Sequence, residues 1–531
     1  MIKKEALWLY MVMCLFSLSI PSTANSGTQN SNPDNICDST LSELAISSEW
    51  LSLLHYKKTG ERYQSRIKSG EFFLSESGAH EPLSEIIAFK NQSRLATSPN
   101  QHPGCRFPAR AYFLSTSLND KSLATPDNCL WNDTNKQLAN TTKVSLIFPA
   151  PQIRGPGTMF GHILLRFDNP HQPTLLSPSI NYAARTTGSN TLSLVWKGLT
   201  GGFNGHFIIK PYYLKIKEYS DMESRDIWEY PLSLSPERIK MISLHAIELQ
   251  DSYSQYYFLD ENCASVMQDI MCIGVDKSSE RRTSPWVIPS EVVHTAWQMR
   301  WTEKPIYQPS SVTKIDHIVR TAPSDAILRA KDLIGFNTTQ QTAFNDVIEN
   351  KAHLLASEMI KYKYTKFEID QEAFTAQLSR HGNKDTIIPT EPTAPHAGHN
   401  AARLSLATLA GSNEKSRIEI GIRPAYHSLE DAKIDGSPLS ELELLKVRAR
   451  IRLSTGDLNI HEATLIYIKA VPSSNDFTTQ WSWMLYIGGS RRYLGQGAMP
   501  LHFQAAGGLG KAKTFLDSGT AYVLWGIRAS A

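Results

Sequence analysis

Residues 445–453, LKVRARIRL, alternate between apolar and cationic side chains along the whole segment. Successive side chains of a β-strand point to opposite faces of its sheet, so this spacing predicts a strand with one apolar and one charged face. Looser alternation in SRIEIGIR and WSWMLYI predicts neighbouring strands. We therefore expect an antiparallel β domain over residues 401–531.

The remaining segments differ in their hydrophobic period, which divides the chain into regions. Residues 25–140 are expected to be helical and loop-rich, because LSELAISSEWLSLLHY and PLSEIIAFKNQS carry apolar residues at helical spacing. Residues 141–322 begin with short apolar runs typical of strands and continue with helices predicted from Ser235 to Leu259 and from Asn262. A polar helical segment, 323–386, and a linker, 387–400, follow. The sequence therefore predicts an α+β protein of several domains.

The N-terminus has the order of a secretory signal peptide. A basic start, MIKKEA, precedes the apolar run ALWLYMVMCLFSLSI, and PSTANS supplies small residues, so residues 1–24 are expected to be removed after Ala24. Cleavage before Cys14, as in a lipoprotein, is the alternative. No later apolar run is long enough to predict a transmembrane helix. The mature protein is expected to be exported.

Charge and cysteine usage narrow the function classes. Charged residues make up 20% of the chain, its net charge is +3 and both signs are mixed, so no nucleic-acid partner is expected. No CxxC or His-rich metal spacing occurs, and no metal or cofactor is expected. Removal of the leader leaves an odd set of cysteines, among which Cys105 and Cys129 are the preferred disulfide, while the pairing of Cys37 and Cys272 stays open.

Cys263 is placed at the start of a predicted helix. Apolar residues follow it at helical spacing, and Asp260 or Asn262 is expected to cap the helix. Free backbone N–H groups and the helix dipole at that end favour a thiolate, the nucleophilic form of cysteine. The alternatives are that Cys263 only begins the buried face or forms a disulfide.

His162 is placed at the head of the predicted strand HILLRF, after a Pro- and Gly-rich loop. An imidazole there can accept a proton from a thiol, because its ordinary pKa lies near neutrality. The alternatives are an ordinary half-buried histidine at this position, or His206 in GGFNGHF as the base. Neither residue alone shows that it is paired with Cys263.

The pairing of Cys263 with His162 is inferred from five sequence blocks that occur in this order: TMFGHILLRFD, INYAAR, WKGLTGGFNGHF, KPYYLKIKEYSDMESRDIWEY and YYFLDENCAS. Together they resemble the Lnb N-terminal periplasmic domain family, which is similar to NlpC-type papain-like enzymes with a circularly permuted order. The resemblance implies a periplasmic protein in which Cys263 is the nucleophile and His162 its base. Asn181 is the expected third residue that orients the histidine, with Ser179 as the alternative.

The resemblance also implies a reaction. Lipoprotein N-acyltransfer would take an acyl group from a phospholipid onto Cys263 as a thioester, and then onto a lipoprotein N-terminus. Glu218, Arg225 and Tyr182 are candidate substrate-binding residues, although a structural ion pair is the favoured interpretation of Glu218 and Arg225. The glycines between 198 and 205 are expected to form a rim over the site. A peptidoglycan peptidase or amidase and a non-catalytic envelope binding protein are the alternative functions, and the β domain is expected to contact the outer-membrane surface.

Overall fold

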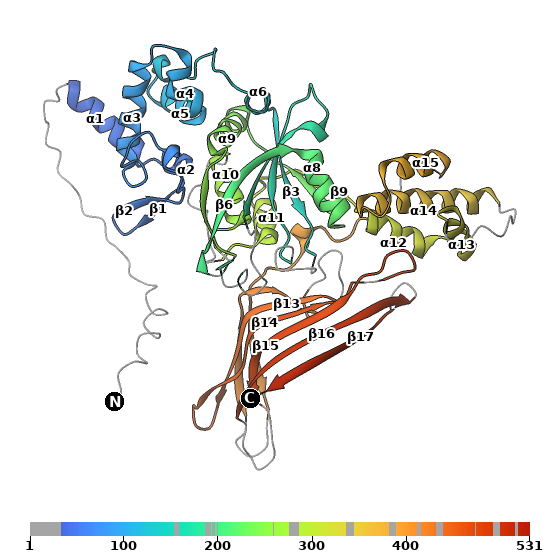
Figure 1. The fold of residues 1–531 in the computed structure, drawn as a ribbon. Helices are drawn as coiled ribbons and strands as arrows, with labels where there is room; N and C mark the ends of the chain where they lie inside the picture. The colour runs from blue at the N-terminus through green and yellow to red at the C-terminus, as the bar shows by residue number, and fades with distance from the viewer. Residues whose placement is uncertain are drawn as a thin grey trace.

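A computed structural model describes residues 33–530, apart from the short segments 153–158, 186–192, 194–196, 199, 259, 275–285, 336–344, 382–388, 411–415, 432–438, 473, 492–499 and 516–518. The predicted signal peptide, with Cys14, lies outside the described residues, as does the side chain of Cys37. The fold is α+β, as the sequence predicts, with helical regions beside two antiparallel sheets (Figure 1).

The N-terminal region is mostly helical. It contains α1 (Pro33–Ala45), α2 (Ser48–Leu53), α3 (Pro82–Leu95), α4 (Pro103–Arg106), α5 (Pro108–Ser117), α6 (Asp133–Ala139) and a hairpin of β1 (Tyr56–Thr59) and β2 (Arg62–Ser65). The hairpin was not predicted, because its strands are short and lack clear alternation. A disulfide joins Cys105 to Cys129, the pair preferred on sequence grounds.

The central region is built on an antiparallel sheet in the order β8-β6-β5-β4-β3-β7-β9. Its strands are β3 (Lys143–Pro149), β4 (Leu164–Asp168), β5 (Pro178–Ala184), β6 (Phe203–Pro211), β7 (Ile227–Pro231), β8 (Tyr253–Tyr256) and β9 (Ile306–Gln308). Strand β3 is buried on both faces after its first residue, which accounts for its mostly apolar sequence. The helix predicted to run from Ser235 to Leu259 is wrong in its second half. It ends near Asp251, which has a φ of 64°, and β8 then pairs with β6.

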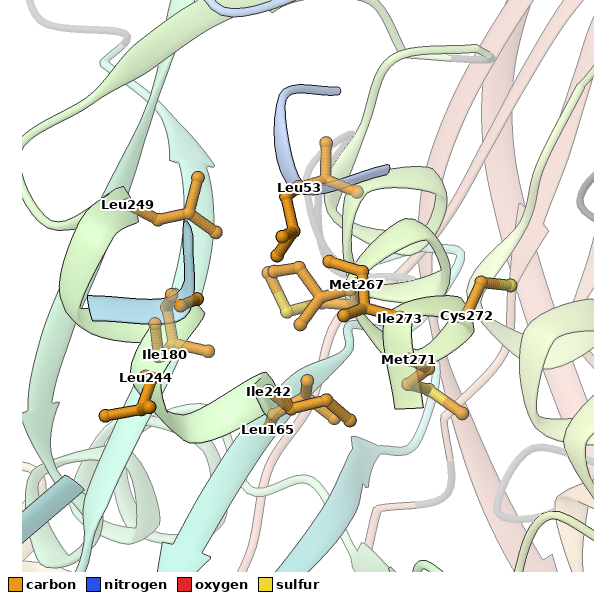
Figure 2. Close-up of a cluster of buried hydrophobic side chains, with 14 of the residues drawn as sticks. Leu53, Leu165, Ile180, Ile242, Leu244, Leu249, Met267, Met271, Cys272 and Ile273 are labelled. Carbon is orange, nitrogen blue, oxygen red and sulfur yellow. The ribbon is translucent and has the colours of Figure 1, made fainter. Parts of the chain in front are cut away.

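Two helices, α9 (Pro236–Leu249) and α10 (Cys263–Gly274), pack against this sheet. Figure 2 shows Ile242 of α9 and Met267 of α10 gathered with Leu165 and Ile180 of the sheet and with Leu53 of α2. All of them are fully buried. One continuous core therefore joins the N-terminal helices, the sheet and the helix that begins with Cys263.

After α10 the chain forms the short edge strand β9 and a second group of helices. Helix α11 (Pro289–Gln298) is followed by α12 (Ser311–Thr321), α13 (Ser324–Leu333), α14 (Asp346–Thr365) and α15 (Gln371–His381). Ile315 of α12 is buried with Leu355 and Met359 of α14, so α12 packs with the helices after residue 323. The segment expected to be a linker is docked, since the His396 ring lies 4.0 Å from the Trp297 ring of α11.

The C-terminal region is an antiparallel sheet in the order β10-β11-β13-β14-β15-β16-β17, with β12 (Ala425–His427) paired to β13. Its long path contains β10 (Arg403–Leu409), β11 (Arg417–Arg423), β13 (Glu441–Arg452), β14 (Leu458–Ala470), β15 (Ser482–Arg491), β16 (Leu501–Phe515) and β17 (Gly519–Ser530). One end of the sheet abuts the central region, where Leu442 and Ile468 are buried with Met159 and Ile288 (Figure 1). Among the described residues, no helix has the length and apolar character needed to cross a membrane.

Candidate active site

Asn262 fixes the start of the helix that carries Cys263. Its side-chain oxygen accepts hydrogen bonds from the backbone N–H groups of Ala264 and Ser265, at 2.9 and 3.1 Å. Its side-chain nitrogen donates to the backbone oxygens of Phe258 and Val287, at 2.9 and 2.7 Å. Of the two caps expected from the sequence, Asn262 is therefore the one used, and it ties the helix start to two neighbouring segments.

The Cys263 side chain is buried and forms no disulfide. Backbone N–H groups of Ile163, Ala264 and Cys263 itself face the sulfur, and Arg225 adds a positive potential; all of these lower the pKa of the thiol. Burial acts more strongly in the opposite direction and raises the pKa of Cys263 to about 11. The helix start therefore favours a thiolate, as expected, but burial outweighs it and Cys263 is a protonated thiol in this state.

His162 lies two residues before β4, and its position depends on the backbone conformation of Gly161. Gly161 has a φ of 84°, a conformation that side-chain-bearing residues rarely adopt, and an added Cβ would lie 2.9 Å from the Phe148 ring. The His162 Nε2–H group donates to the side-chain oxygen of Asn181 at 2.5 Å. Burial lowers the pKa of His162 to about 3, the Asn181 bond raises it, and Arg225 and Lys215 lower it further. The imidazole is therefore neutral near pH 7.

The helix that begins with Cys263, α10, packs on β4 and β5, the strands nearest to His162 and Asn181. Because the N–H group of Ile163 faces the Cys263 sulfur, the nucleophile candidate lies beside the residue that follows His162. Asn181 is paired with Leu164 across β4 and β5, which places its amide next to the histidine. Cys263, His162 and Asn181 therefore occupy one buried region, although they are separated by up to a hundred residues of sequence.

Comparison with family models gives the same family as the five sequence blocks do. Residues 132–294 match the family model described as the Lnb N-terminal periplasmic domain. These residues, 132–294, are called the Lnb domain below, after the family that they match. Residues 42–117 and 392–531 match two families described as domains of unknown function, DUF7843 and DUF7840. No curated protein and no solved structure matches the chain. The family name indicates an exported protein of the cell envelope.

Two tyrosines of the Lnb domain border the site and were not expected from the sequence. The Tyr219 ring lies 5.6 Å from the His162 ring and is buried. The Tyr256 hydroxyl accepts a hydrogen bond from the backbone N–H of Cys263, and burial holds the pKa of this hydroxyl well above its usual value. The segments that carry these tyrosines have no sequence pattern that indicates a site. The two residues are identified only by their positions beside His162 and Cys263 in the structure.

The three candidate substrate-binding residues of the Lnb domain have other partners. Arg225 is buried and donates to the backbone oxygens of Pro149 and Ala150, both at 2.7 Å, and pairs with Glu223 at 2.9 Å. Glu218 pairs with Lys215 at 2.7 Å, so Glu218 and Arg225 each have an ion-pair partner other than one another. The structure places Tyr182 in the core, where its hydroxyl bonds Ser254 at 2.6 Å. Arg225 supports the loop before His162, and Tyr182 offers no exposed surface to a ligand.

His206 and Ser179, the second candidates for the base and for the orienting residue, contact groups away from Cys263. His206, on β6, has its ring 5.6 Å from Tyr253, and Ser179 donates to the backbone oxygen of Lys210 at 2.8 Å. Neither residue therefore takes the place of His162 or Asn181 in the hydrogen bonding around the site.

The glycine run contacts the segment leading to Cys263, because the backbone N–H of Phe258 donates to the oxygen of Gly198 at 2.8 Å. Gly205 lies within β6, where an added Cβ would lie 2.2 Å from Tyr182. Close packing, rather than an open rim, accounts for this glycine.

One group of potential metal ligands occurs among the described residues, outside the Lnb domain. His399, His427 and Asp431 offer ligand atoms within 4.8 Å of one another. Asp431 already pairs with Arg423 at 2.6 Å, and the two histidine rings hydrogen-bond each other at 2.7 Å. These protein contacts account for the cluster.

Proposed function

We propose that the Lnb domain is a thiol acyltransferase of permuted papain-like architecture, with Cys263 as nucleophile, His162 as base and Asn181 as the residue that orients the base. The observation that carries this proposal is the grouping of the three side chains at the start of α10 and the adjoining strands. The Cys263 sulfur faces the N–H group of Ile163, the residue after His162, and the neutral His162 imidazole donates its single N–H to an amide oxygen. Both features support this chemistry.

In the first half-reaction, the Cys263 sulfur attacks the carbonyl carbon of a phospholipid ester while His162 accepts the thiol proton. The tetrahedral oxyanion collapses, the ester C–O bond breaks, and the leaving alkoxide takes the proton back from His162. The products are a thioester on Cys263 and a lysophospholipid. Because His162 and Cys263 are both neutral at rest, proton transfer accompanies the attack.

In the second half-reaction, the α-amine of a lipoprotein N-terminus attacks the thioester carbon. His162 accepts a proton from the amine and returns it to the departing Cys263 sulfur, so an amide forms and the thiol is regenerated. An α-amine has a pKa near 8 and is partly unprotonated at neutral pH, which suits it to this role. The family name indicates a periplasmic location, which supports access to an envelope phospholipid and to a lipoprotein N-terminus.

Intact-mass spectrometry of the full chain after incubation with phosphatidylethanolamine micelles tests the proposal. We expect a mass gain of one acyl chain that neutral hydroxylamine removes, and its loss in Cys263→Ala. Cys272→Ala is the matched control, because Cys272 is buried on the same helix and the adduct should persist.

Two results would overturn this function. Release of stem peptides from purified peptidoglycan without any acyl adduct would identify a hydrolase that uses the same residues. Absence of both an adduct and released peptides, with the protein folded, would identify a non-catalytic binding protein.

A further inference from the structure

The paired charges of the C-terminal sheet lie on one face, where acidic side chains neutralise basic ones. Arg450 pairs with Glu419 at 2.6 Å, Lys446 pairs with Glu443 at 2.9 Å, and Arg448 pairs with Glu462. All of these side chains except Arg450 line a polar cavity of about 420 Å³. The cationic positions of LKVRARIRL therefore point to a partly enclosed surface and have acidic partners on neighbouring strands.

The opposite face of this sheet is apolar and exposed; we call it the apolar face. Strand register places directly opposed residues on the same face, and one uncharged row crosses six strands. The row consists of Leu404, Ile422, Val447, Ala463, Gly489 and Phe503. Most of the exposed large hydrophobic side chains of the described residues lie in this last quarter of the chain. Exposed apolar areas of this extent mark binding surfaces.

The apolar face is continuous with an interface that is already formed. A second row runs from Leu442 through Ile468 and Leu485 to Gly507 and Ile527. Leu442 and Ile468 are buried against the Lnb domain, whereas Ile527 is 85% exposed. Among the described residues, the same surface is thus buried by protein at one end of this row and exposed at the other.

The border of the apolar face indicates what covers it. Lys511 lies on this face, opposite Val523 and beyond Leu509, and its ammonium group is 5.1 Å from the centre of the Trp481 ring. Trp481 and Trp525 are both more than half exposed. Tryptophan and lysine at the edge of an apolar surface suit the headgroup region of an anionic bilayer, with hydrocarbon beside them.

We propose that the apolar face of residues 401–531 contacts the hydrocarbon of an anionic lipid bilayer, with Trp481 and Lys511 at the level of the headgroups. The part of the Lnb domain that packs on this sheet, which includes Met159, then lies next to the lipid surface. Met159 is three residues before His162 in the sequence. This inference stands on residues of the β domain and holds whether or not Cys263 is catalytic. It also gives the proposed acyltransferase access to a lipid donor without a membrane-spanning helix among the described residues.

Flotation of the full chain with vesicles of phosphatidylethanolamine and phosphatidylglycerol tests this. We expect the wild type and Cys263→Ala to float, and the floated fraction of the double variant Leu404→Glu/Ile527→Glu to be at least tenfold smaller. The matched control is Leu95→Glu/Leu130→Glu, which places the same charges at exposed leucines of the N-terminal region and should float normally. Equal flotation of both variants, or no flotation of the wild type, would overturn the proposal.

Photo-crosslinking keeps the proposal testable if the double variant misfolds. A benzophenone amino acid at position 527 should form a lipid adduct in vesicles, and one at position 95 should not. A protein–protein crosslink at position 527, together with a doubled mass by light scattering without lipid, would show instead that a second copy covers the apolar face.

Discussion

His162 and Asn181 are joined by a hydrogen bond of 2.5 Å from the imidazole Nε2–H to the amide oxygen. A neutral imidazole carries one N–H group and one lone pair, so this bond leaves the lone pair on Nδ1. Asn181 thus determines which ring nitrogen can accept a proton. It is fixed by its place on β5, opposite Leu164 and next to the turn at Gly161.

Substitution Asn181→Ala should slow formation of the acyl adduct. Loss of the acceptor frees the ring to adopt the wrong tautomer and orientation, and we expect a rate reduced by about 10- to 100-fold, part of what a general base contributes. Asn181→Asp retains an acceptor and should recover part of the rate. Ser179→Ala is the control on the same strand. Equal losses in Asn181→Ala and Ser179→Ala would indicate a structural effect only.

Alkylation of Cys263 should be slow at neutral pH. Burial raises its pKa to about 11, so the thiolate is scarce, and the rate with iodoacetamide should increase about tenfold per pH unit between pH 8 and 10. At pH 8 the folded protein should react about 100-fold more slowly than the urea-unfolded chain, whose thiol has an ordinary pKa. Peptide mass spectrometry reports the rate. A plateau below pH 8 would mean that a thiolate–imidazolium pair already exists at rest.

The pH dependence of stability should change when His162 is replaced. Burial lowers the pKa of this group to about 3, so the unfolded chain binds a proton below about pH 6.5 while the folded chain does not. The free energy of unfolding therefore falls as pH decreases from 6.5 toward 3, by about 2 kcal/mol at pH 5. His162→Gln should lack this component, and urea denaturation at pH 7 and pH 5 measures the difference. His171→Gln, at an exposed position, controls for the loss of an imidazole.

Much of the fold follows from local patterns. Alternation predicted the strand at 445–453, which the structure extends to Glu441–Arg452, and helical spacing predicted α10 with Asn262 as one of two possible caps. The pattern could not show that Arg448 and Arg450 meet Glu462 and Glu419, because these partners come from other strands. Strand β8 was missed since its pairing with β6 outweighs its local preference.

The candidate site also has features that the sequence predicts and features that depend on tertiary packing. A helix start can be read from the sequence, but the net effect on a thiol depends on how much water the folded chain excludes. Two N–H groups of the helix start face the Cys263 sulfur, as its position in the sequence implies, and the N–H group of Ile163 adds a third, yet burial determines the sign of the pKa change of Cys263. Tyr219 and Tyr256 reach the site through tertiary packing, which no local pattern predicts.

Arg110 interacts with residues of both the N-terminal and the central regions and should therefore stabilise the junction between them. Arg110 on α5 is fully buried, pairs with Glu85 of α3 at 2.8 Å, and donates its backbone N–H to Glu248 of α9 at 2.8 Å. Arg110→Met leaves two buried carboxylates without their cation and should cost about 3–5 kcal/mol.

Hydrogen exchange of α3 and α5 with increasing urea measures this loss. Arg106→Met is the matched control, because Arg106 pairs with Glu71 at the surface and should cost less than about 1 kcal/mol. Adding Glu85→Gln to Arg110→Met should recover part of the stability, since it removes one uncompensated charge while keeping an acceptor for the backbone N–H groups of Leu74 and Ser75. Equal effects of Arg110→Met and Arg106→Met would contradict a buried network at this junction.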